Sequence, residues 1–128
     1  MNGILLNIVP TWAVEFYEDD AGCPVQDFLN ALEPRKRAKV IAIIAVLEEQ
    51  GPTLPFPYSS QIEGKLRELR THYGQDQYRV LYYGAVDRTF VLLHAFVKRT
   101  KQTPAGDVKL AKERMNGSVT QKQKRRER

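Results

Sequence analysis

Arginine, lysine and aromatic side chains recur together in three apolar segments in the second half of the chain. The segments read LRELR (66–70), YRVLYY (78–83) and TFVLLHAFVKR (89–99). Arginine forks bind phosphate oxygens in a bidentate manner, and aromatic rings stack on nucleobases. If the three segments pair as strands of one meander, alternate side chains share a face and the cations converge on one surface. The pattern therefore favours RNA as the partner.

Arg70 and Arg79 flank the turn between the first two segments and are candidates for phosphate binding. The alternative is a pair of solvated arginines that Glu68 or Asp76 balances. Glu68 is also a candidate general base. Taken alone, the role that we favour for Glu68 is to orient the two arginines.

A second group of cations, Lys98, Arg99 and Lys101, closes the third segment just before a predicted helix. A helix N-terminus attracts anions, so this position favours a phosphate contact over an ordinary solubilising surface. In the same segment His94 is either a proton carrier near neutral pH or a packed, hydrogen-bonded histidine. Of the neighbouring Tyr82 and Tyr83, alternation places one in the core and leaves the other free to stack on a base.

Four further cations, Arg35, Lys36, Arg37 and Lys39, crowd the start of a predicted helix. The helix dipole disfavours positive charge there. They either extend a nucleic-acid-binding surface or form a solvated helix end, and the sequence does not separate the two readings.

Metal and cofactor signatures are missing from the sequence. The two histidines, His72 and His94, are 22 residues apart and Cys23 is the one cysteine, so we predict no metal site. No glycine-rich phosphate loop occurs, and we predict no cofactor. A single cysteine is typical of a reducing cytosol, and the longest apolar run, 40–47, is too short to span a bilayer. We therefore expect a cytoplasmic protein without a membrane contact.

The element order predicted along the chain is β-α-α-β-β-β-α. We expect a strand at 12–18, two adjacent helices at 25–32 and 34–50, the three strands above and a helix at 104–115; residues 1–10 are typical of a strand extension or a packed arm, and 59–64 are ambiguous. This order defines an α+β domain at 1–116. A helical hairpin and a C-terminal helix pack against one face of a small antiparallel sheet, a three-stranded meander joined by the N-terminal strand.

The formal net charge of +5 is unevenly distributed, because residues 117–128 carry five Lys or Arg and one Glu. The domain itself is nearly neutral, so any anion site on it must be a local patch. The tail 117–128 has little apolar content, and we predict that it is disordered.

The sequence resembles the RelE/ParE toxin superfamily, and within it the phage-derived HigB-like branch. The resemblance rests on WAVEF (12–16), ELR (68–70), YRV (78–80), HAFVKR (94–99) and KQTP (101–104), in this order and spacing. It implies a toxin of a type II toxin–antitoxin pair that cleaves ribosome-bound mRNA without a metal, by attack of the 2′-hydroxyl on the adjacent phosphate.

The resemblance also implies roles for individual residues. Arg79 matches the strand arginine at the scissile phosphate, Arg99 with Lys98 matches the basic pair at the end of the last strand, and Arg70 supports the same site. Glu68, Tyr83 and His94 remain the candidates for the base and the acid. Lys101 and the helix cations Arg35, Lys36 and Arg37 would contact RNA.

Partners implied by the resemblance are mRNA, the ribosome and a cognate antitoxin, a small helix-turn-helix protein that covers the basic face or blocks ribosome entry. One alternative is a ParE-like toxin that poisons DNA gyrase by binding and needs no catalytic residues. Another is a phage or host protein that kept the fold as an interaction module. The full cationic and aromatic set favours the nuclease.

Overall fold

The computed structural model describes residues 12–127. The elements along the chain are β1 (Ala13–Phe16), α1 (Pro24–Ala31), α2 (Pro34–Gln50), the short 3₁₀ turn η2 (Gly51–Thr53), β2 (Ser59–Glu63), β3 (Leu66–Tyr73), β4 (Asp76–Ala85), β5 (Thr89–Lys98) and α3 (Ala105–Arg126). The proposed arm at 1–10 lies outside the described residues. None of the helices in the described part of the chain is long and apolar enough to cross a membrane.

The five strands form one sheet in the order β1-β5-β4-β3-β2. The pairs β2–β3, β3–β4 and β4–β5 are antiparallel, whereas β1 lies parallel to β5. The predicted α+β class and the meander are confirmed. The segment that we left ambiguous adds one strand, β2, so the order is β-α-α-β-β-β-β-α. Its alternation is weak because β2 is an edge strand with little apolar burial.

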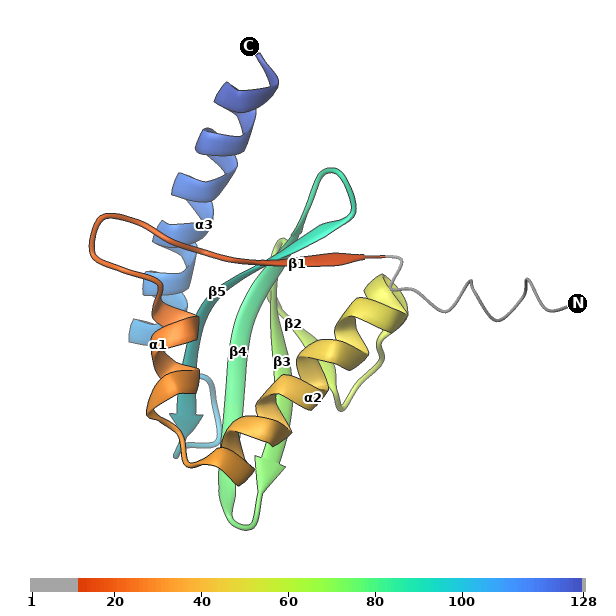
Figure 1. Cartoon of the computed structure of the whole chain (residues 1–128), viewed down its shortest axis with the longest axis vertical. Coiled ribbons are helices and arrows are strands. Elements are labelled where there is room, and N and C mark those ends of the chain that lie inside the picture. Colours follow the sequence, from red (N-terminus) through yellow and green to blue (C-terminus); the bar gives the residue numbers. More distant parts are fainter. Residues whose placement is uncertain (1–11, 128) are drawn as a thin grey trace, which may run out of the picture.

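Helices cover both faces of the sheet, not one face as the sequence suggested (Figure 1). The side chains of Tyr78, Val80 and Tyr82 on β4 pack with the core under α1 and α2. The alternate side chains Leu81 and Tyr83 pack with the core under α3. Both faces of β4 are therefore apolar, and a strand buried on both faces needs a helical layer on each side.

Helix α3 is longer than predicted, because it continues to Arg126 through the segment that we expected to be disordered. Two contacts hold this extension to the sheet. The buried Ser118 hydroxyl lies 2.7 Å from the hydroxyl of Tyr83, and the ammonium of Lys122 donates to the Glu15 carboxylate over 3.0 Å. The basic residues at the end of α3 also suit the negative end of the helix dipole. Low apolar content misled the prediction, since these anchoring contacts are polar.

The turn between β3 and β4 sets the geometry of the cationic residues. Gly74 has φ of 61°, a left-handed conformation that glycine adopts without strain. Gly74 and Gln75 connect Tyr73 directly to its partner Asp76. This tight connection fixes the register of the two strands and therefore the pairing of the residues farther along them.

Candidate nucleic-acid interface

Arg70 and Arg79 face each other across β3 and β4. They are register partners in the antiparallel pair, as are Glu68 and Leu81 two residues further on. Side chains at alternate positions share a face, so Glu68, Arg70 and Arg79 lie on the face that α3 covers. The predicted pairing of the two arginines across the first hairpin is therefore present.

A buried carboxylate, that of Glu68, connects the two arginines. Its Oε1 atom lies 3.4 Å from Nε of Arg79 and 3.9 Å from Nε of Arg70. Its other oxygen, Oε2, accepts a hydrogen bond from the hydroxyl of Thr103. With both oxygens engaged and only 3% of the residue exposed, Glu68 is placed to fix the arginines.

Arg79 is 4% exposed and is held from two sides. Its Nη1 atom donates to the carbonyl oxygen of Tyr78 at 2.9 Å, and its Nε faces Glu68 without a hydrogen bond in the described structure. Burial of the guanidinium lowers the pKa of Arg79, Glu68 opposes that shift and Arg70 adds to it. Most of the guanidinium is therefore fixed in orientation by the protein.

The side chain of Lys98 belongs to the same electrostatic group. Burial lowers the pKa of its ammonium, Glu68 raises it, and the positive charges of Arg79 and Arg70 lower it again. Three cations thus compete for one carboxylate. An anion that enters beside them would relieve this repulsion, which is the electrostatic character that a phosphate site requires.

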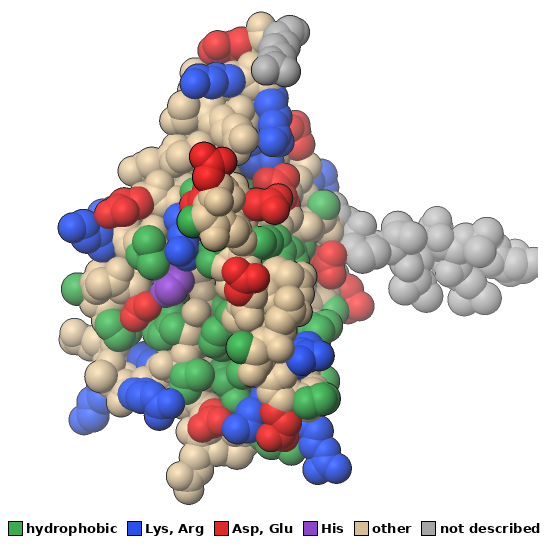
Figure 2. All heavy atoms as spheres, turned by 60° about the vertical axis from the view of Figure 1, so that its left-hand side comes forward, with side chains coloured by type: hydrophobic (Ala, Val, Ile, Leu, Met, Phe, Trp, Pro, Cys, Tyr) green, Lys and Arg blue, Asp and Glu red, His purple; other side chains and the backbone are tan. Residues whose placement is uncertain are grey.

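A shallow depression of about 590 Å³ opens over these residues. Three of its lining residues are polar and uncharged and the other five are cations; the lining consists of Arg70, Gln75, Gln77, Arg79, Lys98, Arg99, Thr100 and Lys101. No carboxylate is among them. Figure 2 shows lysine and arginine side chains, with acidic side chains between some of them, at the lower end of the molecule, where Figure 1 places the β3–β4 turn. The structure therefore brings together five of the predicted cations.

His94 lies on the same face of the sheet, opposite Leu81. Both of its ring nitrogens have partners, because Nε2 lies 2.6 Å from Oδ1 of Asp107 and Nδ1 lies 3.2 Å from Nη1 of Arg114. A guanidinium only donates, so Nδ1 accepts and Nε2 carries the proton toward Asp107. Of the two alternatives offered for His94, the arrangement matches a packed, hydrogen-bonded histidine.

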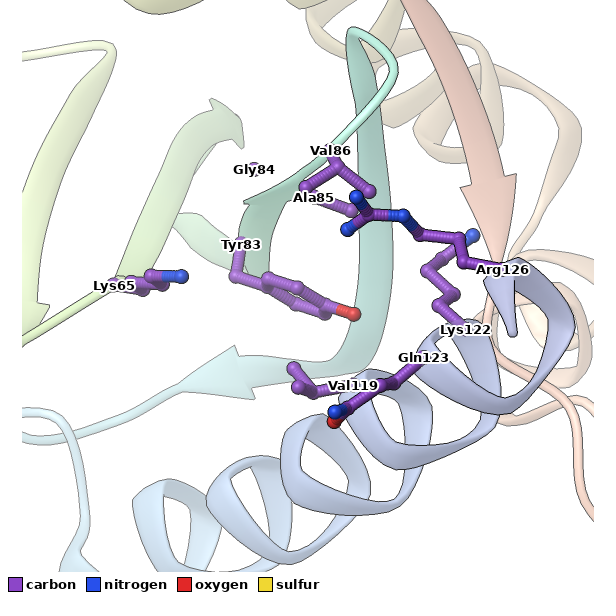
Figure 3. Close-up of a pocket in the computed structure, with 9 residues that line it drawn as sticks. All are labelled: Lys65, Tyr83, Gly84, Ala85, Val86, Val119, Lys122, Gln123 and Arg126. Carbon is purple, nitrogen blue, oxygen red and sulfur yellow. The ribbon is translucent and has the colours of Figure 1, made fainter.

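Tyr83 lies away from the cationic depression. It is four residues along β4 from Arg79, a separation of about 13 Å at the strand rise. Its side chain projects from β4 toward α3, into a separate pocket of about 200 Å³ (Figure 3). The Tyr83 hydroxyl pairs with Ser118, which makes it an anchor for α3 in this structure. The prediction that one of Tyr82 and Tyr83 is free to stack on a base is wrong, because helices cover both faces of β4 and both rings are buried.

Of the four cations at the start of α2, the three that were predicted to contact RNA have different surroundings. Arg37 donates from Nε to the carbonyl of Leu29 at 2.8 Å and from Nη2 to the carbonyl of Leu32 at 2.9 Å, so it satisfies the C-terminal end of α1. Lys36 pairs with Asp76 at 3.0 Å. Arg35 is exposed. The hydrogen bonds of Arg37 and the ion pair of Lys36 explain why positive charge is tolerated at the start of α2, where the helix dipole disfavours it.

Thr103 is a site residue that sequence reasoning missed, since it was considered as part of the KQTP segment before the last helix. The helix begins at Ala105 with Pro104 in the N-cap position and no side-chain cap. The Thr103 hydroxyl instead reaches Glu68, which is 35 positions away in sequence. No local signal in the sequence indicates such a contact. Within residues 12–127, no group of three His, Cys, Asp or Glu side chains is arranged to hold a metal ion.

The fold and this site define a small α+β protein with a cationic depression at one end of its sheet. A family model described as phage-derived protein, Gp49-like, matches residues 27–116, which is well over half of the chain. The chain therefore belongs to the Gp49-like family of phage-derived proteins. A search of curated proteins found no match.

Proposed function

We propose that this protein is the toxin of a type II toxin–antitoxin system and acts as an mRNA endoribonuclease on ribosome-bound message. The observation that carries the proposal is the depression in which Arg70, Arg79, Lys98, Arg99 and Lys101 converge without a lining carboxylate. Membership of the Gp49-like family supports it, because that family is commonly grouped with RelE- and HigB-like toxins.

The reaction assigned to this site needs only the RNA, solvent water and the protein's own side chains. The 2′-hydroxyl oxygen bonds to the adjacent phosphorus and the bond from phosphorus to the 5′-oxygen breaks, which leaves a 2′,3′-cyclic phosphate and a 5′-hydroxyl. Water in the open depression takes the proton of the 2′-hydroxyl, because the Glu68 carboxylate is buried and engaged, and Lys98 gives a proton to the departing oxygen.

Each cation has a role in this scheme. Arg79 and Arg70 stabilise the negative charge that develops on the phosphorane, an electrostatic contribution that fixed cations make efficiently. Lys98, whose pKa is lowered by burial, gives its proton to the leaving 5′-oxygen. Glu68 is a positioning residue, since its two oxygens are engaged with the arginines and Thr103. Arg99 and Lys101 hold the RNA backbone at the exposed rim.

A toxin of this kind requires an inhibitor in the same cell. We propose a cognate antitoxin, a small helix-turn-helix protein whose acidic surface covers the cationic depression or blocks entry to the ribosome. Co-purification of the two proteins from a host that expresses both genes would test the partnership, and Arg99→Gln would weaken it only if the antitoxin covers the depression.

The nuclease proposal is tested by primer extension on a reporter mRNA after brief induction. The wild-type protein should produce new 5′ ends in register with codons. Arg99→Gln should abolish them while the circular dichroism spectrum stays unchanged, because Arg99 is exposed at the end of β5. Arg126→Gln is the matched control: it removes an exposed arginine at the far end of α3 and should leave cleavage intact.

Growth arrest with intact mRNA would refute the nuclease and make DNA gyrase the next target to assay. Cleavage that persists in Arg99→Gln would keep the nuclease but move the reaction away from this depression.

A further inference from the structure

Two of the most exposed large apolar side chains lie beside the cationic depression. Phe56 is 70% exposed and Tyr58 is 51% exposed, and both belong to the loop between η2 and β2. The guanidinium carbon of Arg70 sits 5.2 Å from the centre of the Phe56 ring. Exposed aromatic rings next to a cation need an explanation, because burial of each would remove a large apolar area from water.

A groove of about 400 Å³ runs between α2 and β3 next to this loop. Its charged and aromatic lining residues are Lys39, Tyr58, Arg70, His72 and Arg79. None of the lining residues is a carboxylate. An occupant with negative charge and flat apolar groups fits such a lining, and single-stranded nucleic acid has both.

The groove is continuous with the depression, because Arg70, Gln77 and Arg79 line both. The edge strand β2 makes this possible. Its pairing with β3 ends at Leu69, and the last bond between the two segments joins the Arg70 N–H to the Tyr58 carbonyl at 2.8 Å. Beyond that bond the edge of β3 is open, so a ligand can pass from one face of the sheet to the other.

We propose that this groove is a second RNA subsite, in which nucleotides next to the scissile phosphate stack on Tyr58 in the groove and on Phe56 beside it, against Arg70, while Lys39 and Arg70 contact their phosphates. This subsite extends the nuclease proposal and rests on it, because the position of the scissile phosphate sets the direction in which the RNA strand runs through the groove. A base inserted between the aromatic rings and the open strand edge would fix the register of the message in the depression.

Stacking on the two rings contributes to affinity for any base sequence, because every base has a π-face. Loss of one stacked base weakens binding by about tenfold or more. The subsite therefore selects single-stranded over double-stranded RNA, since paired bases are not free to stack on protein side chains.

The test is fluorescence anisotropy of a labelled 2′-O-methyl RNA 12-mer, which the proposed chemistry does not cleave, at low salt. We expect the full-length protein to bind it, and Tyr58→Ala and Phe56→Ala each to raise Kd by about tenfold. Tyr58→Trp keeps a stacking ring and should bind as well as the wild type. Ile41→Ala is the matched control, because Ile41 is 49% exposed on α2 and is not among the groove's lining residues.

Each outcome decides one proposal. Equal Kd values for wild type, Tyr58→Ala and Phe56→Ala, or no binding by the wild type, would overturn the subsite. Loss of a protein partner by the aromatic variants, with an unchanged Kd for RNA, would also overturn the subsite. Tight binding that depends on the aromatic rings, with no cleavage of mRNA by the wild type in the primer-extension assay, would support the subsite and reject the nuclease.

Discussion

The buried pair of Glu68 and Arg79 ties stability to the geometry of the site. Both residues are at least nine-tenths buried, and the atoms that face each other are 3.4 Å apart. Removing one member of such a pair leaves an uncompensated charge in the interior, which costs about 3–5 kcal/mol. Replacing both members with uncharged side chains leaves no unpaired charge in the interior and avoids most of that cost.

We therefore predict that Glu68→Gln lowers the free energy of unfolding by about 3 kcal/mol. The double variant Glu68→Gln, Arg79→Met should recover most of the loss, although it should not cleave RNA. Urea denaturation of the wild type, both single variants and the double variant gives the coupling energy of the pair. Additive losses would show that the two side chains do not depend on each other.

A second prediction at the scale of single residues concerns the pKa of the Lys98 ammonium. Burial lowers the pKa of its ammonium below the usual 10.5, the Glu68 carboxylate opposes the shift, and Arg70 reinforces it. Arg70→Met should therefore raise the pKa of Lys98 and Glu68→Gln should lower it further. Titration of the Lys98 side-chain resonances by NMR measures both shifts. Identical values in the two variants would contradict the grouping of these charges.

The sign of the pH dependence follows from the same pKa. Between the lowered pKa of folded Lys98 and the ordinary value of 10.5 in the unfolded chain, the unfolded state binds more protons. The contribution of Lys98 to stability therefore rises with pH in that interval. Catalysis runs the opposite way, because a proton donor loses activity as pH rises through its folded pKa.

At the scale of elements, the C-terminal half of α3 is the feature that most separates the structure from the sequence prediction. Ser118 is 5% exposed and shares a hydrogen bond of 2.7 Å with Tyr83, and Lys122 pairs with Glu15. A chain that ends after residue 116 loses all of these contacts. A chain that ends after residue 123 keeps them and loses only the exposed end of the helix.

We predict that truncation after residue 116 destabilises the protein by about 2 kcal/mol, through the lost hydrogen bond and packing. Truncation after residue 123 should change stability by less than about 0.5 kcal/mol, since residues 124–127 are exposed. Thermal unfolding followed by circular dichroism compares the two. Equal melting temperatures for the wild type and the shorter chain would show that residues 117–123 do not pack on the sheet in solution.

The elements that were predictable are those whose pattern is local. The two prolines and the glycine around α2 mark its ends, and the helix runs over the predicted residues from Pro34 to Gln50. The alternation of β3 to β5 is equally local. In contrast, β2 is half exposed and short, so its alternation carries little signal. The far end of α3 is held by polar contacts with residues distant in sequence, which no local pattern encodes.

The candidate site also has a part that local sequence patterns predicted and a part that they did not. Cations on neighbouring strands were expected to converge, and register pairing brings Arg70 beside Arg79. The bond from Thr103 to Glu68 and the ties of His94 to Asp107 and Arg114 depend on how α3 crosses the sheet. These contacts decide which side chains are free to carry protons, so that part of the site was not predictable from spacing.

At the scale of the whole molecule, the position of charge should matter more than its amount. The chain has a formal net charge of +5, and a large share of it lies in the last residues of α3, at the opposite end of that helix from the depression. Electrostatic attraction to RNA falls off over about 10 Å at moderate salt. Cations around residues 124–128 therefore contribute little to a phosphate bound near Arg79.

Two variants of equal net charge separate position from amount. Lys98→Gln, Arg99→Gln, Lys101→Gln removes three charges, and truncation after residue 123 removes four cations and one carboxylate, so both proteins have a formal net charge of +2. We predict that the triple variant loses mRNA cleavage and at least tenfold in affinity for the 12-mer, because it loses three local phosphate contacts. The truncated protein should keep its activity and nearly all of its affinity.

The slope of log Kd against log salt should fall by about two to three in the triple variant and stay unchanged in the truncated one. Equal losses of affinity in the two proteins would mean that RNA binding depends on overall charge. That result would reject the depression as the RNA-binding site.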